Sequence, residues 1–219
     1  MRATVNNVSL FYEKYGSGPP LLLLHGNGED HAIFGRVGAR LAQRFTIYAL
    51  DSRGHGQSQL DVQVDYYLMA EDVRQFVKLT GIGPADVLGF SDGAIVAVLV
   101  ALKDPGALNK MALLGVNLDP SDLTEAALKY VLEEFETGGH PLYELILTEP
   151  HIPLESLAAV KNPVLLVAGE NDIIRPEILD AIAGTLPDCR QMTVKGHDHM
   201  SYISGSDLLA EDFIKFFLG

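Results

Sequence analysis

The chain has 219 residues and a formal net charge of −13, from 16 basic against 29 acidic side chains. This charge repels phosphate backbones and anionic lipids, which argues against nucleic acid or a membrane surface as a partner. The longest apolar run covers residues 94–102, far fewer than the roughly 20 that a membrane-spanning helix needs. The first residues lack the pattern of a secretory signal, so we expect a cytoplasmic protein.

Strand and helix patterns alternate along the chain, and the length suits one domain over residues 1–219. In chain order the patterns predict strands at 8–15 and 20–24, a helix at 31–43, a strand at 45–50, a helix at 66–79, a strand at 85–90, a helix at 92–102, strands at 110–116 and 163–168, a helix at 177–184, a strand at 190–194 and a last helix from about 206. Such alternation predicts an α/β protein with a mainly parallel sheet covered on both faces.

One segment interrupts the alternation, because residues 117–157 show no strand pattern. Within it, residues 121–136 predict an amphipathic helix, and Asp122 with Glu125 is the expected N-terminal cap. The apolar stripe of this helix consists of Leu123, Ala127, Val131 and Phe135. An insertion of this kind is either a lid over the strand ends or a surface excursion without gating, and the sequence leaves both open.

A G-x-S-x-G sequence, Gly89-Phe90-Ser91-Asp92-Gly93, follows an apolar strand and opens an apolar helix. Strand, sharp turn and helix are the context that a nucleophile elbow requires. Glycines relieve crowding where the serine backbone is strained. Ser91 is therefore the predicted nucleophile.

A serine hydroxyl needs a base to take its proton and a third group to orient that base. Asp172 follows the strand at 163–168, and Gly196-His197-Asp198-His199 follows the strand at 190–194. Serine, acid and histidine then stand in a chain order known for serine triads. This order alone admits either His197 or His199 as the base.

Four motifs together resemble the α/β-hydrolase superfamily over nearly the whole chain: residues 25–28 (HGNG), residues 51–58 (DSRGHGQS), the GFSDG elbow, and the GEND and GHDH strand ends. The resemblance implies the α/β-hydrolase fold, a twisted, mainly parallel sheet with helices on both faces. The insertion at 117–157 is then the expected short helical lid within this domain. The resemblance also implies that the backbone N–H groups of Asn27 and Asp92 form an oxyanion hole, and that no cofactor or metal is needed.

The same resemblance favours His199 over His197, because many members place the histidine three residues after a glycine such as Gly196. It disfavours dehalogenases and epoxide hydrolases, which carry aspartate where this chain has Ser91. Asp119 is a rival for the triad acid, since some members carry the acid after the preceding strand, but Asp172 fits the pattern better.

Several other side chains have simpler interpretations. His25 and His55 resemble structural positions of the superfamily, in glycine-rich turns. Residues 197–199 (HDH) are a weak zinc signal, because residues one and two apart on a loop rarely converge on one ion. The single Cys189 is expected to be a strand residue with no chemical role.

These features predict a serine hydrolase of the carboxylesterase type, in which Ser91, His199 and Asp172 cleave a small carboxylic ester through an acyl-enzyme intermediate. A hydrolase of thioester, aminoacyl or C–C bonds and a weakly or non-catalytic binding homologue remain alternatives. The Asp92 side chain, next to the nucleophile, is a candidate for attracting a cationic or amino-bearing substrate. The sequence identifies neither the physiological substrate nor the oligomeric state.

Overall fold

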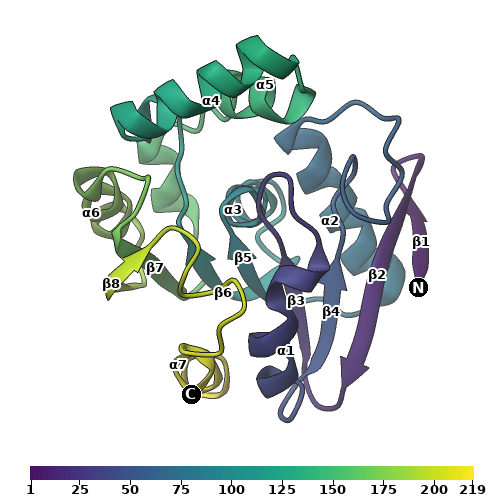
Figure 1. The fold of residues 1–219 in the computed structure, drawn as a ribbon. Coiled ribbons are helices and arrows are strands. Elements are labelled where there is room, and N and C mark those ends of the chain that lie inside the picture. The colour runs from purple at the N-terminus through teal and green to yellow at the C-terminus, as the bar shows by residue number, and fades with distance from the viewer.

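A computed structural model describes residues 1–219 as an eight-stranded sheet flanked by helices (Figure 1). The strands are β1 (Arg2–Val5), β2 (Val8–Gly16), β3 (Pro20–Leu24), β4 (Thr46–Leu50), β5 (Ala85–Phe90), β6 (Leu108–Leu114), β7 (Val164–Asn171) and β8 (Cys189–Asp198). Their order across the sheet is β1-β2-β4-β3-β5-β6-β7-β8. The β1–β2 and β2–β4 pairs are antiparallel and all other pairs are parallel, so the mainly parallel sheet is confirmed.

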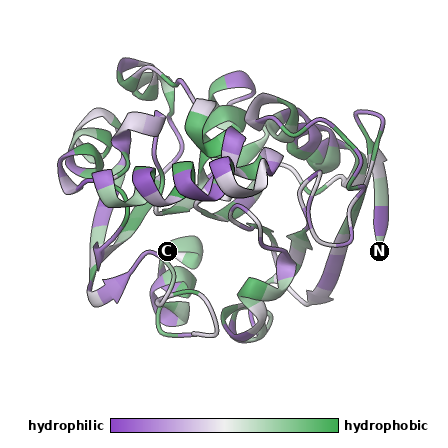
Figure 2. Ribbon diagram, turned by 45° about the horizontal axis from the view of Figure 1, so that its top comes forward, coloured by the Kyte–Doolittle hydropathy of each residue, from purple (hydrophilic) through white to green (hydrophobic).

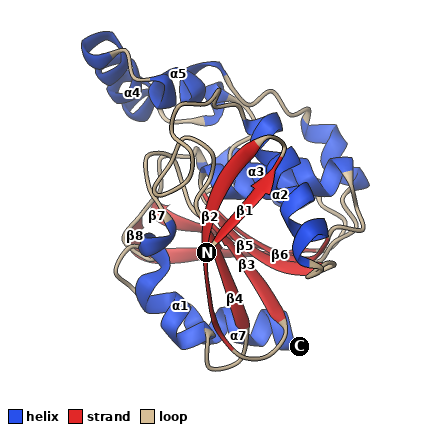
Figure 3. Cartoon of the chain, turned by 90° about the vertical axis from the view of Figure 1, so that its right-hand side faces the viewer, coloured by secondary structure: helices blue, strands red, loops and turns tan.

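Helices cover both faces of this sheet (Figure 3). One face packs against α1 (Gly35–Leu41) and α7 (Ala210–Leu218), and the other against α2 (Tyr66–Thr80), α3 (Asp92–Lys103) and α6 (Pro176–Thr185). No helix combines the length and the apolar character needed to cross a bilayer.

Strand β3 shows how the sequence builds these two layers. Leu21 and Leu23 belong to the apolar cluster that contains α1 and α7, whereas Leu22 and Leu24 belong to the cluster of α2 and α3. Consecutive side chains of a strand point to opposite faces, so a strand covered on both sides is apolar throughout. The continuous apolar runs that predicted buried strands therefore have a direct structural cause.

Some element boundaries differ from the expected ones. The strand expected at 8–15 is β2, and a further strand, β1, precedes it. The turn between them holds Asn6 and Asn7, whose φ angles of 47° and 60° asparagine tolerates better than most residues. The helix expected at 31–43 is a 3₁₀ turn at His31–Phe34 followed by α1. The last helix begins at Ala210 rather than near residue 206.

The expected cap of the helix in the insertion is wrong. This helix is α4 (Glu125–Gly138), and Thr124 caps it by accepting the Ala127 N–H at 3.3 Å. Threonine is a common N-cap because its hydroxyl satisfies a donor that the first turn leaves free. Asp122 instead accepts backbone N–H groups from residues that precede it.

A second helix of the insertion, α5 (Pro141–Thr148), was not expected from the sequence. It begins with a proline, which fits the first helical position because that N–H would have no partner within the helix. We call α4 and α5 together the cap hairpin; it lies above the sheet at the top of Figure 1. Hydrophilic and hydrophobic residues alternate along it in Figure 2, as the amphipathic pattern predicts.

Candidate active site

One edge of the sheet brings the predicted site residues together. Strands β3, β5, β6, β7 and β8 are parallel, so their C-terminal ends meet at this edge. Ligands bind outside the C-terminal ends of the strands in open sheets of this kind. The residues that directly follow these five strands are His25, Ser91, Gly115, Asp172 and His199.

Ser91 occupies a sharp turn between β5 and α3, with φ 51° and ψ −115°. A positive φ is strained for any residue other than glycine, and such strain is typical of functional sites. The Ser91 N–H donates to the Leu114 carbonyl oxygen at 2.8 Å, which holds the turn against β6. A Cβ on Gly89 would overlap the backbone of Gly93, so the close approach of strand and helix requires glycine. The turn thus has the geometry that the motif predicts.

The His199 ring lies between Ser91 and Asp172. Its Nε2 is 3.1 Å from Ser91 Oγ, and its Nδ1 is 2.7 Å from Asp172 Oδ1. A carboxylate only accepts hydrogen bonds, so Nδ1–H donates to Asp172 and Nε2 is left to accept the Ser91 O–H. The Asp172 carboxylate is itself buried and accepts the backbone N–H groups of Gly169 and Ile174. These bonds fix the Asp172 carboxylate, which in turn orients the His199 ring through Nδ1.

Gly115, which the sequence analysis did not single out, makes room for this histidine. It follows β6 with φ +59°, and a Cβ there would lie 2.5 Å from His199 Cε1 and 2.7 Å from Nδ1. The only signal in the sequence was a glycine near the end of the strand expected at 110–116, which is too common to indicate a role.

The rival residues lie elsewhere. His197 Nδ1 is 3.1 Å from Ser201 Oγ, so of the two histidines only His199 bonds Ser91. Asp119 Oδ2 is 2.7 Å from His151 Nδ1, whereas Asp172 is the acid that hydrogen-bonds His199.

The resemblance assigned an oxyanion hole to the backbone N–H groups of Asn27 and Asp92. Asp92 is the first residue of α3, so its N–H has no acceptor within the helix, and the helix N-terminus favours negative charge. The Asn27 N–H makes no hydrogen bond with the protein. Asn27 Nδ2 donates to Asp92 Oδ2 at 3.0 Å and to the Leu142 carbonyl oxygen of α5 at 3.1 Å, which ties this loop to α3 and the cap hairpin.

The Asp92 side chain is buried and does not face the active-site cavity. Only 6% of the residue is exposed, and its Oδ1 accepts the Tyr66 O–H at 2.7 Å while Oδ2 accepts from Asn27. Burial raises the pKa of Asp92, although these hydrogen bonds oppose that effect. The carboxylate does not line the cavity beside Ser91, so the expectation that it attracts a cationic substrate is wrong.

A cavity of about 810 Å³ separates the strand ends from the cap hairpin, and both Ser91 and His199 line it. The volume is within the range typical of small-molecule sites. From the cap hairpin it is lined by Tyr130, Val131, His140, Leu142, Tyr143 and Ile146, and from the loop after β3 by Asn27, Gly28 and Glu29.

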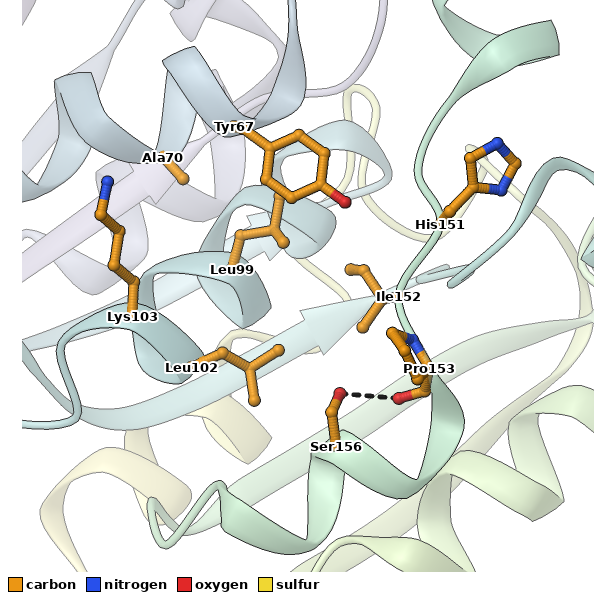
Figure 4. A pocket seen from close by; sticks show the side chains of 9 residues that line it. All are labelled: Tyr67, Ala70, Leu99, Leu102, Lys103, His151, Ile152, Pro153 and Ser156. Atoms are coloured by element: carbon orange, nitrogen blue, oxygen red, sulfur yellow. Dashed lines mark hydrogen bonds between the residues drawn. The ribbon is translucent and has the colours of Figure 1, made fainter.

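A smaller cavity of about 340 Å³ lies between α2, α3 and the segment that follows α5 (Figure 4). Its lining is mainly apolar, and two of its polar side chains already have partners. Lys103 Nζ is 2.8 Å from Glu71 Oε2, and the Ser156 hydroxyl donates to the Pro153 carbonyl oxygen at 2.6 Å. The larger cavity, which holds the serine and histidine pair, is therefore the candidate active site.

His25 and His55 support the surrounding loops. Ser52 N–H donates to His25 Nε2 at 3.0 Å, so Nδ1 carries the proton and donates to the Gly26 carbonyl oxygen at 2.7 Å. His55 Nδ1 is 2.9 Å from the Arg53 carbonyl oxygen. Burial, with the nearby His55, lowers the pKa of His25 from 6.5 to about 4.

We expect the buried His25 to make the protein sensitive to mild acid. The unfolded chain protonates this residue at a higher pH than the folded protein does, so stability is lost as the pH falls from about 6.5 towards 4. The free energy of unfolding should decrease by about 2 kcal/mol between pH 7 and pH 5 through His25 alone. Urea unfolding of the wild type and of His25→Asn at both pH values measures this difference. An NMR titration in which His25 protonates near 6.5 would contradict the assignment.

Asp30, His31 and Asp51 form the one group of potential metal ligands, with ligand atoms within 4.8 Å of one another. Asp51 Oδ1 accepts the His31 backbone N–H at 2.8 Å and lies 2.7 Å from His31 Nδ1, and Oδ2 accepts the Gln57 N–H at 2.8 Å. The group does not line the active-site cavity. These hydrogen bonds account for the cluster as support for the loop after β4.

Residues 19–139, more than half of the chain, match the family described as alpha/beta hydrolase fold. The chain belongs to the α/β hydrolase fold family. Human serine hydrolase BPHL is 28% identical over 249 aligned positions, which cover 98% of this chain and 86% of that protein. A pimeloyl-[acyl-carrier protein] methyl ester esterase of Chromobacterium violaceum is 33% identical over 110 residues, or 50% of this chain and 42% of the esterase.

Comparison with solved structures shows similarity over the whole length of this chain. The enol-lactonase from Burkholderia xenovorans LB400 has a TM-score of 0.84 at 20% identity, over 100% of both chains. At that identity the match shows the fold. The chain spans less than half the length of several curated relatives that it matches.

Proposed function

We propose that this chain is a serine hydrolase that cleaves a small carboxylic ester, with Ser91 as nucleophile, His199 as base and Asp172 as the acid that orients it. The observation that carries the proposal is the hydrogen-bonded series from Ser91 Oγ through His199 to Asp172, on a cavity of small-molecule size. Family membership and the serine hydrolase and ester esterase among the relatives support the same reaction class. A serine mechanism of this kind requires no cofactor.

The reaction begins when Ser91 Oγ attacks the ester carbonyl carbon and His199 Nε2 takes the hydroxyl proton. The negative charge on the former carbonyl oxygen faces the N–H groups of Asn27 and Asp92, which act as the oxyanion hole. As the tetrahedral intermediate collapses, the ester C–O bond breaks and the leaving alcohol takes the proton from His199. Water then attacks the acyl-enzyme in the same way, and Ser91 regains its proton as the carboxylic acid leaves.

The insertion at 117–157 is proposed to act as a lid on this site, within a single domain over residues 1–219. Both helices of the cap hairpin line the cavity, and α5 is joined to the Asn27 loop through the Leu142 carbonyl oxygen. A cap that excludes water strengthens the electrostatic interactions inside a site. The cytoplasmic location expected from the sequence stays a prediction.

A panel of p-nitrophenyl esters of increasing chain length, run beside thioester and aminoacyl substrates, tests the reaction class. Labelling with a fluorophosphonate, which needs an activated serine, separates an enzyme from a non-catalytic binding homologue. Labelling of the wild type but not of Ser91→Ala, with turnover of short esters, is the expected result. Absence of labelling in folded protein would favour the binding homologue.

Gly115→Ala should lower kcat/KM by about 10², because displacing a catalytic group by roughly 1 Å can have an effect of this size. The added methyl group would collide with the His199 ring. Gly205→Ala is a matched control, since Gly205 has φ +60° and no neighbour within 4 Å of the added carbon. Both variants should lose about 1 kcal/mol of stability through their positive φ. Equal activities of the two variants would show that Gly115 does not position His199.

A further inference from the structure

The candidate active site contains a carboxyl group that the triad does not use. Glu29, in the loop after β3, lines the same cavity as Ser91 and His199 and is half-buried. Its Oε2 accepts the Gly26 N–H at 3.1 Å. A Cβ on Gly26 would lie 3.0 Å from this oxygen and 3.1 Å from Ser91 Cβ, so the carboxyl and the nucleophile flank the same point of the backbone.

No lysine or arginine side chain offsets this carboxyl. Glu29 forms no ion pair, and neither lysine nor arginine lines the cavity. Asp198 is a second acid on the lining, and the chain as a whole carries a net charge of −13. A substrate carboxylate beside Ser91 would therefore meet like charge with no cation to compensate it.

We propose that Glu29 is a specificity-determining residue, which makes the site select uncharged acyl groups and reject acyl groups that carry a carboxylate. This inference rests on the proposed serine hydrolase function, because it places the acyl group next to Ser91. When neutral, the carboxyl has an O–H to donate to an oxygen atom of an uncharged substrate. When ionised, it repels a substrate carboxylate, and like charges a few ångströms apart in a partly buried site give roughly tenfold discrimination.

The preference for uncharged over carboxylate-bearing acyl groups should increase with pH. Burial raises the pKa of Glu29 from 4.5 to about 7; Asp92 and Asp30 act in the same direction, while the Gly26 N–H and His199 oppose it. The carboxyl is thus mostly neutral below pH 7 and mostly ionised above it. Other titratable groups line the cavity, so the role of Glu29 has to be isolated by substitution; they are Tyr130, His140, Tyr143, Asp198 and His199.

The test compares kcat/KM for two p-nitrophenyl esters of similar length, the uncharged butyrate and the carboxylate-bearing hemisuccinate, at pH 5.5 and pH 8.5. Taking the ratio of the two substrates removes the titration of His199 as base, which affects both equally. In Glu29→Gln an oxygen remains for the Gly26 N–H, but the side chain cannot ionise. Glu136→Gln, the same change at an exposed position of α4, is the control.

The hemisuccinate to butyrate ratio of the wild type should fall as the pH rises. At pH 8.5 it should be roughly tenfold higher in Glu29→Gln than in the wild type. At pH 5.5 the two proteins should agree, and Glu136→Gln should match the wild type at both pH values. A wild-type ratio that is constant with pH, which needs no variant to measure, would overturn the proposal. So would equal ratios for Glu29→Gln and wild type at pH 8.5.

The Ser91→Ala variant separates failure of the Glu29 proposal from failure of the proposed serine hydrolase function. If Ser91→Ala keeps its activity, the serine mechanism is wrong. If Ser91→Ala is inactive and Glu29→Gln has the wild-type ratio, only the role of Glu29 is wrong.

Discussion

Replacing Ser91 with alanine should lower kcat for ester hydrolysis by about 10⁶ and abolish fluorophosphonate labelling, because loss of the nucleophile in a serine triad has an effect of that size. The fold should be retained, since the serine hydroxyl bonds only the His199 ring and faces the cavity. Steady-state kinetics measure the activity, and circular dichroism with urea unfolding measures the fold.

Ser156→Ala is a suitable control for this experiment. The Ser156 hydroxyl lies in the smaller cavity and bonds only a carbonyl oxygen of its own turn. The control should keep both activity and labelling. Full activity in a pure preparation of Ser91→Ala would reject the whole mechanism.

Replacing His199 with alanine should approach the damage of Ser91→Ala, because the members of a triad act as a unit. His199 is the base in the proposed reaction, and its Nε2 is the only imidazole nitrogen that the structure brings to Ser91 Oγ, at 3.1 Å. His197→Ala should cost far less, since His197 bonds Ser201 on an exposed loop. kcat/KM for a short p-nitrophenyl ester measures both variants.

A double variant tests whether Ser91 and His199 act as a unit. Adding His199→Ala to Ser91→Ala should cause little further loss, whereas independent contributions would multiply. If His197→Ala were inactive and His199→Ala active, the base would be His197 and the reaction class would stand.

Local patterns predicted the parts of this protein that depend on neighbours in the chain. Continuous apolar runs identified the buried strands, because a strand covered on both faces needs apolar residues at every position. The G-x-S-x-G motif identified the elbow because it stands between an apolar strand and an apolar helix. The boundaries that differed depend on single caps, as at Thr124, where several residues nearby could have served.

Local patterns could not predict the role of a residue whose contacts are distant in the sequence. Gly115 is separated from His199 by a long stretch of chain, and nothing near it in sequence indicates which ring it accommodates. Asp92 stands next to the nucleophile in sequence, which suggested contact with substrate. Its carboxylate instead bonds Tyr66 of α2 and Asn27 of the loop after β3.

The sequence by itself determined the α/β class, the order of the central strands and helices and the serine at the elbow, since each follows from periodicity or from a motif within a few residues. It narrowed the base to two histidines and ranked the acids only by their resemblance to a family pattern. Only the tertiary structure decided which of them face Ser91 and that Glu29 shares its cavity. The reason is physical: these distances are set by how parallel strands align at one edge of the sheet, and residues far apart in the chain meet there.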